Sequence, residues 1–433
     1  MNFWLPLRNA RRGLRVWDVP QPAEPPGPGG IAGVGSASTS LVDHPKVTNA
    51  TTGDWYVDAG VASSGDGTSL GTAFKTLAEG LAALTSGDTL LVKSGTYSAG
   101  NGITRSTAWA ALTRVMAYGT DRPILDGSNV PFDGNTLRFS GAVNELWHGF
   151  HVRNQNAGGT NGGQTVVFSD NAHDCTLSSV WVSHSLKDGI WGFNAYDLTF
   201  LDCAVWRLGD GFDTDTNTPD TYAITGSVNA GLQGITYVRC FSAHAADDGF
   251  DFFRNNGGEA IDCVVYKPGY YWNGNPAGDG NGFKMGSAES NSGSNKAIGC
   301  IVIGARNNGV DDNSEDDDVT MLRCTAVDCG GWGFQMGASP NATIHDNIGL
   351  GNSGASGDPN ARDWGGTPDS FNTWNLGITN ASFADAGGGD YSLAEGSACI
   401  GAGISGGNLG ASEIALAIAM EWLAKDLSGG FPA

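Results

Sequence analysis

The chain contains 433 residues, and its 67 glycines and 16 prolines favour many short strands and turns over long helices. Its 45 acidic and 23 basic residues give a formal net charge of −22. This charge argues against nucleic acid as a partner, because phosphate binding needs surfaces rich in Lys and Arg. It also disfavours a polyanionic ligand unless a bound cation bridges the two. No apolar segment is long enough for membrane insertion.

Residues 1–50 form a predicted N-terminal arm. Four of the first fifteen residues are arginine, and residues 20–29 have the Pro/Gly composition of an extended linker. The segment lacks the order of basic residues, apolar run and small-residue cleavage site that marks a signal peptide. Two interpretations stay open for this arm: a disordered tail, or a segment that attaches the protein to a virion or similar particle.

Residues 51–405 form the predicted body of the protein. This region opens with a short strand at Trp55, and apolar residues at helical spacing and a strand with its turn at residues 89–97 follow. The helical positions are Phe74, Leu77, Leu81 and Leu84. The series resembles the N-terminal cap of right-handed parallel β-helix proteins. A cap is needed there because the open end of stacked coils would expose apolar surface and unpaired strand edges.

An irregular repeat spans residues 120 to 350 approximately. Six cysteines lie in or at the ends of short strands, and a second apolar strand and a glycine turn follow each of them. They are Cys175, Cys203, Cys240, Cys263, Cys300 and Cys324. The shortest spacings between them, 23 and 24 residues, suit a coil of three strands. We therefore predict an all-β, right-handed single-stranded parallel β-helix, in which the six cysteines stack as one internal ladder of reduced thiols.

Residues 406–433 form the predicted C-terminal segment. Apolar residues between positions 411 and 426 indicate a helix, and they include Ile414, Ile418, Met420, Trp422 and Leu423. We predict that this helix caps the open end of the coil stack. The alternative interpretation is a subunit contact.

The stretch from Cys240 to Met285 contains the residues that favour chemistry. Asp247, Asp248 and Asp251 fall within five residues, and Lys284 follows in a similar Gly-Phe setting. Clustered carboxylates suit a hard cation such as Ca²⁺, which takes roughly six to eight oxygen ligands. A lysine held close to a cation can lose its proton and serve as a base. Three residues before other turn glycines are interpreted as structural, since Asp and Asn bond to nearby backbone in turns: Asp188, Asn281 and Asn308.

These motifs resemble those of the family nine polysaccharide lyases, a group of Ca²⁺-dependent pectate lyases with a right-handed parallel β-helix fold. The matching segments are Asp210-Gly-Phe, Asp247-Asp-Gly-Phe-Asp251, Gly280-Asn-Gly-Phe-Lys284 and Asn308-Gly-Val-Asp-Asp-Asn313. The resemblance implies Asp210, Asp247, Asp248 and Asp251 as Ca²⁺ ligands and Lys284 as the base. It covers about residues 55–405 and is most specific in the middle third.

The chain departs from the family pattern near the first of these segments. A longer stretch follows Asp210, Ala245-Ala246 replaces an Asn-Ser pair, and Asp213 and Asp215 stand where a lysine is usual. These changes bear on the substrate more than on the catalytic core. They also make Asp213 and Asp215 alternatives to Asp210 as a metal ligand.

The resemblance implies β-elimination on a 4-linked uronate, with an acidic polysaccharide, pectate-like or capsular, as the partner. Ca²⁺ would neutralise the uronate carboxylate and Lys284 would take the neighbouring proton. The candidates for sugar contacts are Arg254, Tyr270, Tyr271, Trp272 and Arg306. Loop packing is the competing interpretation for the three aromatic residues.

Two other functions stay open. A β-helix glycoside hydrolase would need two carboxylates flanking the bond, which the Asp pair could supply, but the intact motif ending in Lys284 argues against it. The protein could instead be a polysaccharide-binding spike of a phage or phage-like particle, with or without depolymerase activity. Its predicted location is accordingly extracellular or on the surface of such a particle.

Overall fold

The computed structural model describes residues 46–131, 134–153, 164–185, 187–208, 222–225, 234–253, 255–286, 294–313, 319–336, 342–355, 358–363 and 369–427. Only the backbone is described for residues 222–225, 363 and 369. The chain divides into the units Met1–Ala37 and Ser38–Ala433, and every feature below belongs to the second unit. The predicted arm lies outside the described residues up to residue 45, and so do Asp210, Asp213, Asp215 and Arg254.

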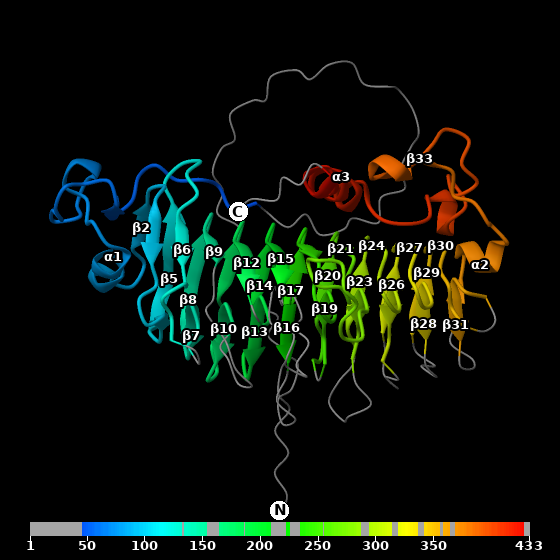
Figure 1. Cartoon of the computed structure of the whole chain (residues 1–433), viewed down its shortest axis with the longest axis horizontal. Coiled ribbons are helices and arrows are strands. Elements are labelled where there is room, and N and C mark those ends of the chain that lie inside the picture. Colours follow the sequence, from blue (N-terminus) through cyan, green and yellow to red (C-terminus); the bar gives the residue numbers. More distant parts are fainter. Residues whose placement is uncertain are drawn as a thin grey trace, which may run out of the picture. The chain divides into compact units, whose positions relative to one another are not determined.

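The second unit winds into coils whose strands build three parallel sheets (Figure 1). In each coil the chain passes through sheet 1, then sheet 2, then sheet 3, so that neighbouring strands within a sheet come from successive coils. Pairing within these sheets is parallel, and its register is continuous between β11 and β14 of sheet 1 and between most strand pairs, with a shift between β5 and β8. The predicted all-β parallel β-helix is confirmed.

Sheet 1 contains β1 (Trp55–Val57), β2 (Thr89–Val92), β5 (Ala108–Ala117), β8 (Val143–His148), β11 (Thr176–Ser178), β14 (Thr199–Leu201), β17 (Thr236–Val238), β20 (Glu259–Ile261), β23 (Lys296–Ile298), β26 (Thr320–Leu322), β29 (Thr343–His345) and β32 (Asp369–Ser370). Sheet 2 contains β3 (Thr96–Ser98), β6 (Ile124–Asp126), β9 (His151–Arg153), β12 (Trp181–Ser185), β15 (Ala204–Leu208), β18 (Phe241–Ala243), β21 (Val264–Tyr266), β24 (Ile301–Ile303), β27 (Thr325–Val327) and β30 (Ile348–Leu350). Sheet 3 contains β4 (Ile103–Arg105), β7 (Leu137–Ser140), β10 (Val166–Ser169), β13 (Ile190–Phe193), β16 (Tyr222–Thr225), β19 (Phe250–Asp251), β22 (Phe283–Lys284), β25 (Val310–Asp311), β28 (Phe334–Met336) and β31 (Ala361–Asp363).

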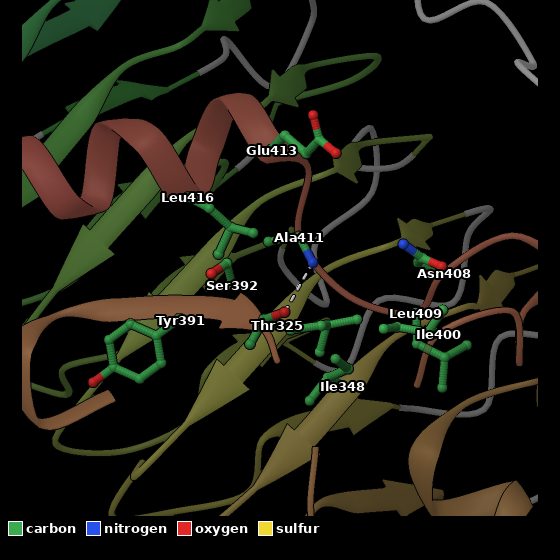
Figure 2. Close-up of a pocket in the computed structure, with 11 residues that line it drawn as sticks. Thr325, Ile348, Tyr391, Ser392, Ile400, Asn408, Leu409, Ala411, Glu413 and Leu416 are labelled. Atoms are coloured by element: carbon green, nitrogen blue, oxygen red, sulfur yellow. Dashed lines mark hydrogen bonds between the residues drawn. The ribbon is translucent and has the colours of Figure 1, made fainter. Parts of the chain in front are cut away.

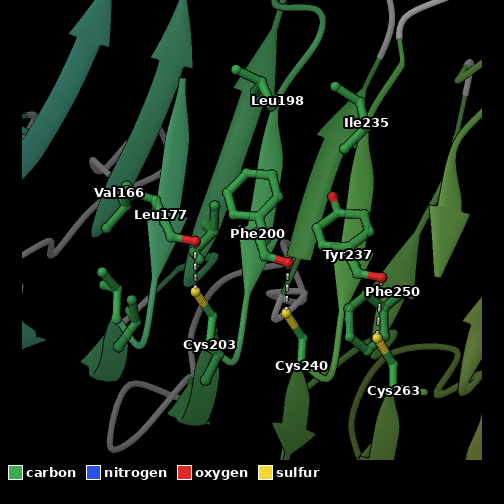
Figure 3. Close-up of a cluster of buried hydrophobic side chains, with 14 of the residues drawn as sticks. Val166, Leu177, Leu198, Phe200, Cys203, Ile235, Tyr237, Cys240, Phe250 and Cys263 are labelled. Atoms are coloured by element: carbon green, nitrogen blue, oxygen red, sulfur yellow. Dashed lines mark hydrogen bonds between the residues drawn. The ribbon is translucent and has the colours of Figure 1, made fainter. Parts of the chain in front are cut away.

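Inward-facing side chains of the three sheets form one core that runs along the coils. Phe200 and Tyr237 stack on neighbouring strands of sheet 1 with ring centroids 5.0 Å apart (Figure 3). Phe250 and Phe283 stack at the same separation on neighbouring strands of sheet 3. Side chains alternate between the two faces of a strand. The residue next to each buried phenylalanine of sheet 3 therefore faces outward.

Five of the six predicted cysteines stack at the corner between sheets 1 and 2. The Sγ atom of each donates to a carbonyl of the preceding coil, as from Cys240 to Phe200 at 3.5 Å (Figure 3). These buried free thiols are Cys203, Cys240, Cys263, Cys300 and Cys324. Cys175 corrects the predicted ladder of six, because it precedes β11 at the corner between sheets 3 and 1. Val180 takes the ladder position in that coil.

Helix α1 (Leu77–Ala83) covers the N-terminal end of the coils, as predicted. It begins with a capping box, in which Thr76 Oγ1 accepts from the Glu79 amide and Glu79 accepts from the Thr76 amide. Leu77 and Leu84 are buried in the core. The short 3₁₀ helix η1 (Leu70–Thr72) precedes α1.

The end cap predicted for the C-terminal helix is wrong. Helix α3 (Glu413–Leu427) lies along the outer face of sheet 2, against β18, β21 and β24 in the middle of that sheet (Figure 1). Its Trp422 packs against Trp206 and Phe241. The outward side chains of sheet 2 are apolar in these coils, so this face needs a cover and the helix provides it.

The C-terminal end is covered by helix α2 (Thr373–Leu376), which contacts β30, the last strand of sheet 2. Trp374 of this helix packs on Phe334 with ring centroids 5.1 Å apart. The segment between α2 and α3 contains β33 (Phe383–Asp385), η2 (Ala386–Gly388), β34 (Asp390–Leu393) and η3 (Ile404–Gly406). Within the described ranges, no helix is long and apolar enough to cross a membrane.

Candidate functional site

The predicted carboxylates and the predicted base meet on the outer face of sheet 3. Asp247 and Asp248 lie in the turn that leads from β18 to β19, and Asp251 is the last residue of β19. Lys284 ends β22, the next strand of the sheet, and its register partner is Asp251. The register also pairs the buried Phe250 and Phe283, so Asp251 and Lys284 both face outward.

Lys284 lies between two carboxylates. Its Nζ atom is 3.3 Å from Asp248 Oδ2 and 3.5 Å from Asp251 Oδ2. The second oxygen of each carboxylate accepts a backbone amide: Asp248 Oδ1 from Asn281 at 2.6 Å and Asp251 Oδ1 from Phe253 at 2.7 Å. These hydrogen bonds from backbone amides hold one oxygen of each carboxylate in place, and the other oxygen faces Lys284.

The two aspartates are buried, and this changes their acidity. Burial raises the pKa of Asp248 well above its ordinary value, with a further rise from the charge of Asp247 and an opposing effect from Lys284. Burial likewise raises the pKa of Asp251, against the lowering by Lys284. A cation beside these buried carboxylates would stabilise their ionised forms, so the site favours a further cation.

Asp247 is tied to the loop of residues 267–280. The amide of Asp279 donates to Asp247 Oδ1, so this loop, which connects β21 to β22, contacts the carboxylate turn of the preceding coil. The guanidinium of Arg306, predicted as a sugar contact, donates from Nη1 to Ala277 O at 3.1 Å and to Gly278 O. Arg306 therefore anchors the loop beside the site.

The predicted aromatic contacts all belong to this loop. Tyr270, Tyr271 and Trp272 are half-buried, and Tyr270 pairs with Pro276 in an antiparallel bridge. Trp272 packs against His244 with ring centroids 4.9 Å apart, and Arg207 lies 5.3 Å from its ring. Trp272 thus has the loop-packing contacts of the competing interpretation.

The asparagines before two other turn glycines form a ladder between coils. The amide of Asn308 donates to Asn281 Oδ1 at 3.2 Å, and the amide of Trp332 donates to Asn308 Oδ1 at 2.9 Å. The bond from the Asn281 amide to Asp248 continues the same pattern. These contacts support the structural interpretation of Asn281 and Asn308.

Sequence reasoning assigned no role to Asp311, the register partner of Lys284 on β25. Its carboxylate accepts from Asn308 Nδ2 at 2.8 Å and from Gln335 Nε2 at 3.0 Å, and burial raises its pKa. A signal was present, because Asp311 follows its turn residue by three positions, as Asp251 and Lys284 follow theirs.

The donor chemistry at the site fits a hard cation. Asp248 Oδ2 and Asp251 Oδ2 converge on one point, the position of the Lys284 ammonium, and carboxylate oxygen is the ligand that Ca²⁺ prefers. In the part of the chain that the structure describes, no three His, Cys, Asp or Glu side chains are assembled as a metal cluster. Asp210, the fourth predicted ligand, lies outside the described residues.

A cavity of about 160 Å³ lies elsewhere, between the C-terminal segment and sheet 2 (Figure 2). Thr325 and Ile348 line it from sheet 2, with Tyr391 from β34 and Leu416 from α3. Thr325 Oγ1 accepts from the Ala411 amide at 2.8 Å, which joins the two walls. None of the predicted site residues that the structure describes lines this cavity, so it is separate from that part of the candidate site.

Comparison with known proteins gives a family and a fold. Residues 55–352, more than half of the chain, match the family described as Pel9A-like, right handed beta helix region. The crystal structure of pectate lyase Pel9A superposes with a TM-score of 0.67 at 21% identity, over 83% of this chain and 96% of that one. A rhamnogalacturonan lyase superposes with a TM-score of 0.62 at 18% identity, over 76% of this chain and 90% of that one.

Other comparisons add no functional information. The Dettilon tailspike protein reaches a TM-score of 0.41 at 14% identity, which is too weak to bear on function. The search of curated proteins found no match. At these identities the solved structures show the fold, and the family match shows the relationship. The chain belongs to the Pel9A-like right-handed β-helix family.

Proposed function

We propose that this protein is a Ca²⁺-dependent polysaccharide lyase that cleaves a uronic-acid-containing polysaccharide by β-elimination. The observation that supports it best is Lys284, held 3.3 and 3.5 Å from two buried carboxylates on the outer face of a parallel sheet. The two superposed structures are lyases whose names specify pectate and rhamnogalacturonan. A polymer of that kind is the substrate class we propose here.

Lys284 is the proposed base. In a 4-linked uronate the proton at C5 lies next to a carboxylate, whose negative charge makes the proton hard to remove. Lys284 Nζ accepts that proton in its neutral form. The electron pair of the C5–H bond forms the C4=C5 double bond, and the bond from C4 to the glycosidic oxygen breaks. Solvent water supplies the proton to the departing oxygen.

Asp247, Asp248 and Asp251 would hold the Ca²⁺ ion, together with Asp210 of the preceding coil. The bound ion would neutralise the uronate carboxylate and stabilise the charge that develops on it. Lys284 is favoured as an ammonium while Asp248 and Asp251 are its partners. If the two carboxylates bound another cation, they would stabilise the Lys284 ammonium less, and the neutral amine could then accept a proton.

The loop of residues 267–280 is the proposed wall of the sugar site. Tyr270 and Tyr271 are half-buried and lie close in sequence to Asp279, whose amide bonds to Asp247. We propose that they contact sugar directly, while Arg306 acts by holding the loop in place. Polymers of this class lie outside cells, so we propose an extracellular or particle-surface location.

The test is an eliminase assay on the full chain with polygalacturonate, rhamnogalacturonan and alginate. A lyase creates a C=C bond conjugated with the carboxylate, and the ultraviolet absorbance of the product rises with time. We expect this rise with added Ca²⁺ and its loss with a chelator, restored by excess Ca²⁺. Release of reducing ends without new absorbance would instead show a hydrolase. No cleavage of any uronate polymer would refute the proposal.

A further inference from the structure

We propose that Trp191 and Phe193 form a sugar-binding platform, a remote subsite for the same polysaccharide, on the outer face of sheet 3. The inference deepens the proposed function and rests on it. Both residues belong to β13, in which Ile190 is buried in the core and the side chains alternate between faces. Trp191 is half-buried and Phe193 is 42% exposed, so both rings are accessible from outside.

The two rings lie nearly parallel to each other. Their centroids are 6.5 Å apart, and the angle between their planes is 13°. Pyranose rings have faces made of C–H groups, and these bind flat aromatic surfaces through hydrophobic and dispersion contacts. Two neighbouring aromatic rings on one face offer more such contact than one ring does.

The platform is in line with the candidate site. In the register of sheet 3, Trp191 pairs with Ala223, Ala223 pairs with Asp251, and Asp251 pairs with Lys284. Two strand spacings, about 10 Å in all, separate Trp191 from Asp251. Trp191 also follows Asp188 by three positions, as Asp251 follows Asp248. A polysaccharide that crosses the strands at Lys284 and continues along this face reaches the platform.

The side chains that share the register position of Trp191 on neighbouring strands of sheet 3 favour stacking on a sugar over ion pairing. Between Arg138 and Asp251 the register positions hold Val167, Trp191 and Ala223, none of which is charged. Arg138 itself donates to Ser169 Oγ and to Asp170 Oδ2, both at 3.0 Å for its Nη2 atom. These positions therefore suit contact with the apolar faces of sugars. They lie away from the uronate carboxylate that the proposed cation would bind.

A stacked aromatic pair is not by itself a sugar site, and the chain contains a matched example. His173 and Tyr196 stack with centroids 4.6 Å apart and 12° between planes. They form isolated bridges at the corner between sheets 3 and 1, away from the face that holds Lys284. Position on the face of Lys284 distinguishes Trp191 and Phe193, so Tyr196→Ala is the control for loss of a stacked ring.

The experiment measures affinity separately from catalysis. Wild type, the double variant Trp191→Ala/Phe193→Ala and Tyr196→Ala, all as full chains, are run through gels that contain polygalacturonate or rhamnogalacturonan. Affinity is obtained from the retardation at increasing polymer concentration. The same proteins are assayed for eliminase activity on short and long galacturonate oligomers. We expect the double variant to weaken polymer affinity about tenfold and to raise KM for long oligomers alone, while Tyr196→Ala matches wild type.

The outcomes separate the two proposals. An active eliminase whose double variant binds and cleaves long polymers like wild type would overturn the platform and leave the lyase intact. An inactive wild type that is retarded, with retardation lost in the double variant, would support the platform and refute the lyase. Equal losses in the double variant and Tyr196→Ala, or no retardation of wild type in either gel, would overturn the platform. Thermal unfolding of each variant identifies losses caused by misfolding.

Discussion

Sheets 2 and 3 share the same coils and the same strand spacing, yet their outer faces differ in kind. Three successive coils place Phe241, Val264 and Ile301 outward on sheet 2, where they pack in a cluster with α3. The same coils place Asp251, Lys284 and Asp311 outward on sheet 3, in register with one another. One face is covered by the chain itself, and the other presents charge.

The difference shows how this fold separates stability from chemistry. Inward residues hold the coils together on both sheets, and a continuous cluster of buried apolar side chains runs through the core. The outward residues then decide what each face binds: an apolar face binds a helix of the same chain, and a charged face suits a polar ligand and a cation. If this separation holds, changes on one face should leave the property of the other unchanged.

The largest expected effect is on sheet 3. Lys284→Ala should lower eliminase kcat by about 10²–10⁴-fold, the range typical for loss of a general base. Lys284→Arg should not restore activity, because a guanidinium stays protonated. The matched control is Lys296→Ala, which removes a half-buried lysine of sheet 1 that pairs with Glu259. Product absorbance measures activity, and full activity in a folded Lys284→Ala protein would refute its role as the base.

The next effect is on sheet 2. Trp422→Ala should destabilise the protein by about 3–5 kcal/mol, because this buried ring of α3 packs on Trp206 and Phe241. Urea unfolding followed by circular dichroism measures the loss, and Met420→Ala, at an exposed position of α3, is the control. Under conditions where the variant is folded, kcat should equal that of wild type. A fall in kcat would show that the two faces are coupled.

Acid should weaken the sheet 2 face through His151, whose ring lies 5.4 Å from Trp206. Burial, with Arg153 and His184 nearby, lowers the pKa of His151 from 6.5 to about 3. Between these values the unfolded chain binds a proton that the folded chain does not. The contribution of His151 to stability is therefore complete above pH 6.5 and falls toward pH 3, by at most about 1.4 kcal/mol per pH unit.

The measurement is the urea midpoint of wild type and His151→Gln at several pH values between 7 and 4. Stability of wild type should fall more steeply with acid than stability of the variant, since glutamine does not titrate. Parallel curves would show that other groups dominate the acid response.

The smallest effect concerns the loop beside sheet 3. Arg306→Ala removes the bonds from the guanidinium to Ala277 O and Gly278 O, so the loop should be held less firmly. We expect KM to rise a few-fold, about 1 kcal/mol, with little change in kcat. Steady-state kinetics on polygalacturonate distinguishes these parameters. An unchanged KM would mean that the loop needs no anchor or that it does not contact substrate.

The sequence by itself determined the coil, the cap at the N-terminal end and the neighbours within the candidate site. The matching turns Asp248-Gly-Phe and Asn281-Gly-Phe are enough to stack Asp251 beside Lys284, although an insertion makes this step longer than the 23- and 24-residue spacings of the repeat. The same local pattern places Asp247 and Asp248 in the preceding turn. These features follow from the chain's own period, because every coil repeats one backbone path and equivalent positions lie above one another.

The tertiary structure alone decided the features that depend on residues distant in the chain. Cys175 lies at a different corner from the other cysteines of the repeat, because a coil has more than one buried corner and cysteine suits each of them. Helix α3 lies on sheet 2 because its apolar stripe matches outward residues from several coils, a match that no local pattern contains. Arg306 bonds to its loop only when three-dimensional stacking brings successive coils together.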